Sequence, residues 1–410
     1  MGCGATQTGF GRTGTVNWCT TAKTSPLTVE SGKGYFINTT SGSITVTLPS
    51  SPSAGDIVAF KDYANTWDTN KVTVGRGGSK INGVCEDATL NTESQSVTLI
   101  YVDGTKGWQD IHDSTSNVTG AAYIAATGGN AVVTCGNFKT HIFTGAGCFA
   151  VSAIAACAAD NAVEYLVVGG GAGGGCGPPP AGGQGGAGAG GFRYFSAISP
   201  AGSPLNAPAG QTVTVQTYPI TVGAGGVGAQ CGSTSVGANG SNSTFSSITS
   251  AGGGRGGAGA PTCVNAGAGG SGGGTRSNTT QAGGAGNTPP VSPPQGNDGG
   301  TGASGNFCGA GGGGATAVGT PGPSGPKAGG AGATSSINNT PTTRAGGGGG
   351  GKNGPAGPGG AGGSGGGGAG GQGSSPGTNT EGVSGTANTG GGGGGSGGGN
   401  PGRTGGADGS

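Results

Sequence analysis

The sequence has little charge, almost no histidine and no paired cysteine motif. Charged residues make up 8% of the 410 positions, and 16 Lys+Arg against 15 Asp+Glu leave a net charge of +1. This balance excludes the basic surface that nucleic acid or an acidic membrane would need. His112 and His141 are the two histidines, and no CxxC pair accompanies them, which argues against metal binding and most acid–base catalysis. We therefore expect no enzyme activity, no cofactor and no metal site.

An export signal and a long apolar run are also missing. The first residues contain no apolar stretch behind a basic end. The most apolar window, 149–168, is interrupted by Asp160, Asn161 and Glu164, so we expect no membrane insertion. A chain made in a reducing compartment keeps its thiols by default. If disulfides form later, outside the cell, Cys135 and Cys148 are the first pair to test among the ten cysteines.

Glycine is what the sequence has in excess, with 110 Gly and 23 Pro. Most of the glycines follow position 168, whereas all three tryptophans precede position 109. The first part can bury a modest core, and the second cannot, because Gly and Ala supply little apolar area. This contrast predicts four segments: a glycine-rich start at 1–17, a β-module at 18–113, connecting strands at 114–168 and a glycine-rich domain at 169–410.

The β-module is predicted from short runs of β-forming residues between turn signals. Ile44, Val46 and Leu48 alternate with threonines, the period-two pattern of a strand with one buried face. Trp108 could stack on a sugar, but a core aromatic is the more ordinary interpretation. The predicted strands are 35–37, 44–48, 57–60, 72–74 and 97–102, with further strands at 139–143, 148–154 and 163–168. His141, on one of these, is expected to be a satisfied polar side chain.

The stretch GKGYFINTTSGSITVTLPSSPSAGDIVAFKDYANTWDTNKVTVGRGGSKINGV, followed by SVTLIYVDGTKGWQDI, carries a resemblance. It resembles a small β-module of tail-fibre and other virion fibre proteins in marine tailed phages. A Leu-Pro turn, a Gly-Asp strand start and a terminal Gly-Trp occur in the same order. The resemblance covers about residues 18–113 and implies a virion fibre protein.

Three motifs in the glycine-rich half fail on inspection. Residues 169–174 fit GxGxxG, but Cys-Gly-Pro-Pro-Pro follows where a helix should hold the pyrophosphate. Residues 346–352 fit the Gly-x4-Gly-Lys part of a phosphate loop, yet Asn353 stands where Ser or Thr should bind magnesium. Glycine recurs every third position from 348 to 366, but the register ends at Ala369, so a collagen helix is rejected.

Two structures remain for the glycine tracts. A flexible coil is one, because ordering glycine has the highest entropic cost. The other is a bundle of packed polyglycine-II helices, which make no internal hydrogen bonds and offer every N–H and C=O to neighbours. The low charge and the punctuated tracts favour the ordered bundle. On this model Gly351, Gly354, Gly357, Gly360 and Gly363 share one edge of a helix, so that valine at Gly357 is severe and valine at Ala356 is mild.

The phrases YLVVGGGAGGG, AGGFRYF, YPITVGAGGVG and SNSTFSSITSAGGGRGG resemble the distal adhesin of T-even-like phage long tail fibres. The resemblance covers about residues 139–410. It implies stacked polyglycine-II helices whose loops contact a host receptor. The candidate contact segments are 275–307, 320–344 and 374–388, any of which can equally be an inert connector. The candidate receptor-binding residues are Asn278, Asn297, Asn338, Asn339 and Arg344.

The functional hypothesis is a virion fibre or adhesin of a tailed phage, made in the host cytoplasm and carried on the virion. Its expected partners are a host cell-surface glycan or outer-membrane protein and other virion fibre subunits, without nucleic acid. A purely structural virion fibre or head-decoration protein is the first alternative. An ice-binding protein is the second, because some glycine-rich antifreeze proteins are bundles of the same helices.

Overall fold

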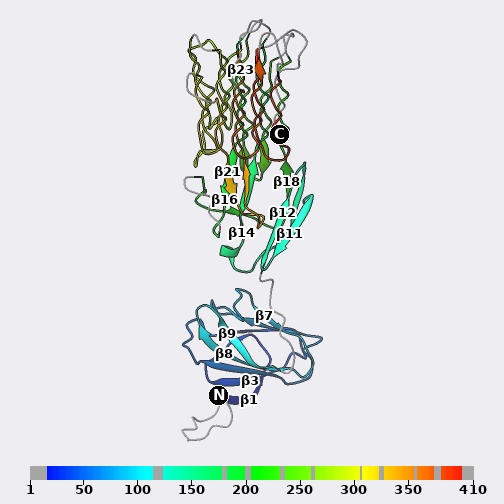
Figure 1. Cartoon of the computed structure of the whole chain (residues 1–410). Helices are drawn as coiled ribbons and strands as arrows, with labels where there is room; N and C mark the ends of the chain where they lie inside the picture. Colours follow the sequence, from blue (N-terminus) through cyan, green and yellow to red (C-terminus); the bar gives the residue numbers. More distant parts are fainter. Residues whose placement is uncertain are drawn as a thin grey trace. The chain divides into compact units, whose positions relative to one another are not determined.

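The computed structural model describes residues 16–113, 123–177, 182–198, 205–230, 236–259, 264–304, 307–322, 327–354, 358–373 and 380–398. Among these residues the regular structure is almost entirely β, and the 3-10 helix η1 (Ala158–Asp160) is the exception. The all-β prediction is confirmed. The chain divides into two compact units (Figure 1). Unit 1 comprises Met1–Ala125 and Ser152–Asn161, and unit 2 comprises Ala126–Val151 and Ala162–Ser410.

Unit 1 contains two sheets. The five-stranded sheet has the order β1 (Asn17–Lys23), β3 (Lys33–Ile37), β5 (Ile57–Asp62), β8 (Ser96–Asp103) and β9 (Gly107–Asp113). The four-stranded sheet has the order β2 (Leu27–Thr28), β4 (Ile44–Thr47), β6 (Val72–Gly75) and β7 (Ala88–Leu90). The first three strands of the larger sheet are parallel, and β8 and β9 are antiparallel to their neighbours.

One apolar core fills unit 1, and the period-two pattern determines which residues enter it. Ile44 and Val46 of β4 are buried, while Thr45 between them is exposed. The five strands predicted in this part of the sequence coincide with β3, β4, β5, β6 and β8, and no strand end differs by more than two residues. Trp108 is 0% exposed and lies edge-on to Tyr101, with ring centroids 5.6 Å apart. The core interpretation of Trp108 is therefore confirmed.

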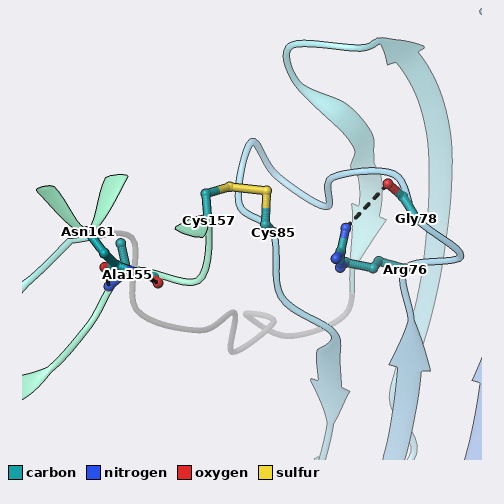
Figure 2. The surroundings of a disulfide bond; sticks show 6 residues. All are labelled: Arg76, Gly78, Cys85, Ala155, Cys157 and Asn161. Carbon is teal, nitrogen blue, oxygen red and sulfur yellow. Dashed lines mark hydrogen bonds between the residues drawn. A yellow bond between two sulfur atoms is a disulfide. The ribbon is translucent and has the colours of Figure 1, made fainter. Parts of the chain in front are cut away.

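A disulfide ties the second segment of unit 1 to the first, and an asparagine closes a loop within that second segment (Figure 2). Cys85 and Cys157 are bonded across 72 residues of sequence. Asn161 accepts a hydrogen bond from the Ala155 N–H at 2.7 Å and donates to the Ala155 C=O at 2.9 Å. Its side chain thus satisfies both backbone groups of one buried residue.

The expected cysteine pair is wrong. Cys135 and Cys148 are exposed free thiols. Cys135 ends β11 (Ala131–Cys135) and pairs with Phe138 of β12 (Phe138–Ile142), whereas Cys148 lies on β13 (Gly147–Ala153) opposite Pro219 of β18 (Thr217–Thr221). The two thiols therefore belong to different sheets, which closeness in sequence could not reveal.

Unit 2 begins with strands and continues into glycine tracts. A five-stranded sheet has the order β10 (Ala125–Thr127), β13 (Gly147–Ala153), β18 (Thr217–Thr221), β19 (Ser243–Phe245) and β20 (Ile248–Ser250). Two-stranded pairs are β11 (Ala131–Cys135) with β12 (Phe138–Ile142), β14 (Ala162–Val163) with β17 (Gln211–Thr212), β15 (Tyr165–Val168) with β16 (Phe192–Phe195), β21 (Ala333–Ser335) with β22 (Thr342–Arg344), and β23 (Lys352–Asn353) with β24 (Gln372–Gly373). His141 is satisfied as expected, since its Nδ1 lies 2.7 Å from the Gly128 carbonyl oxygen. In the described part of the chain, no helix has the length and hydropathy of a membrane span.

The glycine tracts are joined by backbone hydrogen bonds that repeat every third residue. Residues 183–191, here called the central tract, donate nine consecutive N–H bonds of 2.7–3.1 Å. Every third N–H donates to the same neighbouring tract. Residues 183, 186 and 189 donate to the tract 307–313, residues 184, 187 and 190 to the tract 390–396, and residues 185, 188 and 191 to the tract 251–257. Carbonyl groups of the central tract accept from three further tracts. These donor tracts are 271–277, 348–351 and 169–175.

The predicted common edge of five glycines is wrong. Gly351 donates to Gln184, but Gly354 donates to Gly373 and has a φ of +132°. Gly360 and Gly363 belong to a separate tract that runs antiparallel to the first and donates to it. Because they are antiparallel, the two tracts cannot form one helix edge. Ala356 and Gly357 lie outside the described residues.

Candidate functional site

The glycine tracts have two ends: the pairs β15–β16, β19–β20 and β21–β22 mark one, and the two-residue strand β23 lies toward the other (Figure 1). Val168 pairs with Phe192 at the end of the β15–β16 hairpin, and the neighbouring residues continue this register, from Gly169 with Gly191 to Gly175 with Gly185. The hairpins β19–β20 and β21–β22 continue into tracts in the same way. We call the end at these hairpins the strand end and the opposite end the far end.

Three candidate residues lie at the strand end, on the β21–β22 hairpin. Asn339 has a φ of +63° and its N–H donates to the Ser336 carbonyl at 2.8 Å, so it shapes the turn. Arg344 is partly buried, and this burial lowers the pKa of its guanidinium. In the described part of the chain, Arg344 Nη1, Asn338 Oδ1 and Ser335 Oγ are buried without a hydrogen-bond partner.

Half-buried Asn297 connects two tracts. Its Nδ2 donates to the carbonyl groups of Gly314 and Ala315, both at 3.0 Å. Its own carbonyl accepts from the Gly272 N–H. Its side-chain donor group is therefore already used within the glycine unit rather than offered to solvent.

Asn278 lies at the far end, where the structure places it near an exposed aromatic residue. The Ser277 N–H donates to the Gly183 carbonyl, and the Gly183 N–H donates to the Phe307 carbonyl. A Cβ built on Gly182 would lie 2.0 Å from Ser277 Oγ and 3.5 Å from Phe307 Cα. Gly182 and Gly183 thus bring Asn278 and Phe307 to one region, here called the far-end cluster.

The far-end cluster is exposed. Phe307 is 64% exposed and Asn278 is exposed, with a φ of +52°. Asn353 joins them, because its N–H donates to the Phe307 carbonyl at 3.0 Å. One feature of the sequence could have pointed to this site. Phe307 is an isolated aromatic residue, next to Asn and Cys, in a region dominated by glycine.

The candidate residues therefore do not form one site. Asn338, Asn339 and Arg344 lie on one hairpin of the strand end, half-buried Asn297 binds the strand-end turn at Gly314 and Ala315, and Asn278 lies at the far end. In the described residues, no group of three or more His, Cys, Asp or Glu side chains could hold a metal ion. What the geometry offers is an ordered frame of hydrogen-bonded tracts with exposed residues at its ends.

These tracts and strands define a β-protein with a hydrogen-bonded glycine-rich unit. The model of the glycine-rich domain family matches residues 144–410. Since the match covers more than half of the chain, the protein belongs to this family. A 78-residue segment is also 35% identical to the baseplate wedge protein gp10 of Enterobacteria phage T4. That segment covers 18% of this chain and 13% of the phage T4 protein, so the similarity spans a small part of both.

Proposed function

We propose that this protein is a structural component of a tailed-phage virion, in which a bundle of polyglycine-II helices displays a host-contact surface. The observation that carries the proposal is the central tract. Its N–H groups return to the same neighbour after three residues, and three residues per turn is the geometry of this helix type. The partial similarity to a baseplate wedge protein supports the virion location.

The contact surface that we propose is the far-end cluster. Asn278 and Phe307 are exposed there on tracts tied to the central tract by backbone hydrogen bonds. A surface fixed in this way loses little entropy when it binds, which favours recognition. An aromatic ring beside amide groups suits either a cell-surface glycan or an outer-membrane protein. No catalytic role is part of the proposal.

Recombinant virions carrying Phe307→Ser test this proposal. We expect adsorption to host cells to fall about tenfold or more, as for loss of one exposed aromatic anchor. Val318→Ser is the matched control, because Val318 is 60% exposed but lies near the turn at residues 314–317 of the strand end. Equal adsorption by the two variants and the parent would contradict the far-end assignment.

A purely structural virion role is the second candidate, favoured by the baseplate similarity. It predicts that virions with either substitution adsorb normally, while virions lacking the protein fail to assemble or lose a visible component in electron micrographs. Immunogold labelling with an antibody against the chain locates it on the particle. Absence of label from purified virions would reject both candidates.

A further inference from the structure

A row of three aromatic side chains crosses the outer face of the five-stranded sheet of unit 1. Trp18 of β1 and Phe36 of β3 have ring centroids 5.0 Å apart. Phe36 and Tyr63, which follows β5, have centroids 6.4 Å apart. Trp18 is 39% and Tyr63 57% exposed, so this row, here called the aromatic row, is open to solvent at both ends.

The strand register explains why these rings point away from the core. Phe36 lies between Tyr35 and Ile37, both of which are buried in the core. Trp18 pairs with Gly34, two residues from Phe36 on the same face. A Cβ on Gly34 would lie 2.6 Å from the indole of Trp18, so glycine lets the indole lie directly on the sheet backbone. The ring is thereby held in place before any ligand arrives.

The charges beside the aromatic row are separate lysines rather than a cluster, and Lys33 among them is paired with Glu30 at 2.8 Å. Phe36 pairs with Lys61, whose amino group donates to the Ser94 carbonyl. Gly34 pairs with Ala59, which in turn pairs with Thr98. A highly charged ligand therefore finds no complementary cluster among these paired positions.

The size of the row also restricts its partner. A fully buried aromatic side chain contributes about 150–250 Å², and these three are already partly covered. A stable protein interface needs roughly 800 Å² from each partner, which is more than this row supplies. Single-stranded nucleic acid also stacks on aromatic rings, but it needs a positively charged groove along its backbone. The partner that fits is small, uncharged and flat on one face.

We propose that Trp18, Phe36 and Tyr63 form a stacking platform for a neutral oligosaccharide. The axial C–H groups of a pyranose ring present a weakly positive face, which complements the negative face of an aromatic ring. Successive rings in a row allow successive sugar units to stack. This site lies in unit 1, whereas the far-end cluster belongs to unit 2, and it does not depend on the function proposed above.

Tryptophan fluorescence of the full-length protein offers a selective test. Trp67 and Trp108 are 0% exposed, so acrylamide quenching reports mainly on Trp18. The probes are maltohexaose, cellohexaose and chitohexaose, together with a neutral-glycan array and oligo-dT. We expect at least one neutral glycan to protect Trp18 from quenching, and oligo-dT to have no effect.

Two variants separate binding from stability. Tyr63→Ala leaves Trp18 in place and should weaken glycan binding about tenfold or more, as when one stacked ring is lost. Tyr123→Ala removes another tyrosine of unit 1, 70% exposed, and should bind like the parent. If array signals of parent and Tyr63→Ala are equal, if no glycan protects Trp18, or if oligo-dT alone does so, the proposal is wrong. A lower melting temperature of Tyr63→Ala without a binding change would show that the row only stabilises the sheet.

Discussion

At the scale of single residues, close contact between backbones explains why the tracts are glycine. A Cβ on Gly186 would lie 2.2 Å from the Gly348 carbonyl oxygen, and one on Gly183 would lie 2.0 Å from that of Gly351. Real Cβ atoms do not approach backbone oxygens this closely, so a side chain must push two tracts apart. Each hydrogen bond lost in this way leaves a buried donor and acceptor unpaired.

Gly186→Val should therefore destabilise the glycine unit strongly. Each unpaired buried group costs about 1–3 kcal/mol. A loss of about 1 kcal/mol in the free energy of unfolding lowers the melting temperature of a domain of this size by about 2–4 °C. We therefore expect calorimetry to show a fall of roughly 5–10 °C in the melting temperature. Gly145→Val is the matched control, because no atom lies within 4 Å of a Cβ at Gly145. Similar melting temperatures for both variants would show that the tracts are not tightly packed at Gly186.

At the scale of elements, the strands of unit 1 were predictable and the partners of the glycine tracts were not. Alternation such as Ile44-Thr-Val46 predicts which face of a strand is buried, and in the structure Ile44 and Val46 are buried while Thr45 is exposed. A run of glycines has no such pattern, because every position is equally small. The neighbours of the central tract come from positions as distant as 169 and 396. No signal within the tract identifies them.

The same limit applies to the candidate site. The sequence singled out Asn297 because amides bind sugars, but its Nδ2 binds Gly314 and Ala315 instead. It did not single out Phe307, whose exposure depends on which tracts lie beside it.

Hairpins offer a physical explanation of how the register between neighbouring glycine tracts is chosen. Since the β15–β16 ladder continues unbroken into Gly169 and Gly191, the hairpin can fix the alignment before the tracts pack.

The disulfide element gives a prediction of its own. Cys85→Ser should release residues 152–161 from unit 1, because the bond joins that segment to the loop containing Cys85. Loss of a native disulfide typically costs about 2–5 kcal/mol. Hydrogen exchange at the Ala155 amide, which is bonded to Asn161, should accelerate markedly. Cys148→Ser, at an exposed free thiol, is the control and should leave exchange unchanged. Unchanged exchange in both would mean that the loop closed by Asn161 keeps its structure without the disulfide.

At the scale of the whole molecule, the two units are stabilised by different physics. Unit 1 has a conventional core that includes Trp67, Trp108, Phe60 and Ile37. Unit 2 has small apolar groups around Phe192 and Tyr194 and around Phe149 and Phe245, and beyond them mainly backbone hydrogen bonds between tracts. Stability that comes from apolar burial and stability that comes from hydrogen bonds should respond to different substitutions.

We therefore expect two unfolding transitions, each sensitive to its own substitution. All three tryptophans lie in unit 1, so tryptophan fluorescence follows that unit alone, while calorimetry records both. Cys85→Ser should lower the transition seen by fluorescence and leave the other in place. Gly186→Val should lower only the transition that fluorescence does not report, because the packing it disturbs lies among the tracts of unit 2. A single calorimetric peak that coincides with the fluorescence change in the parent and in both variants would show that the units unfold as one, and that stability in one is transmitted to the other.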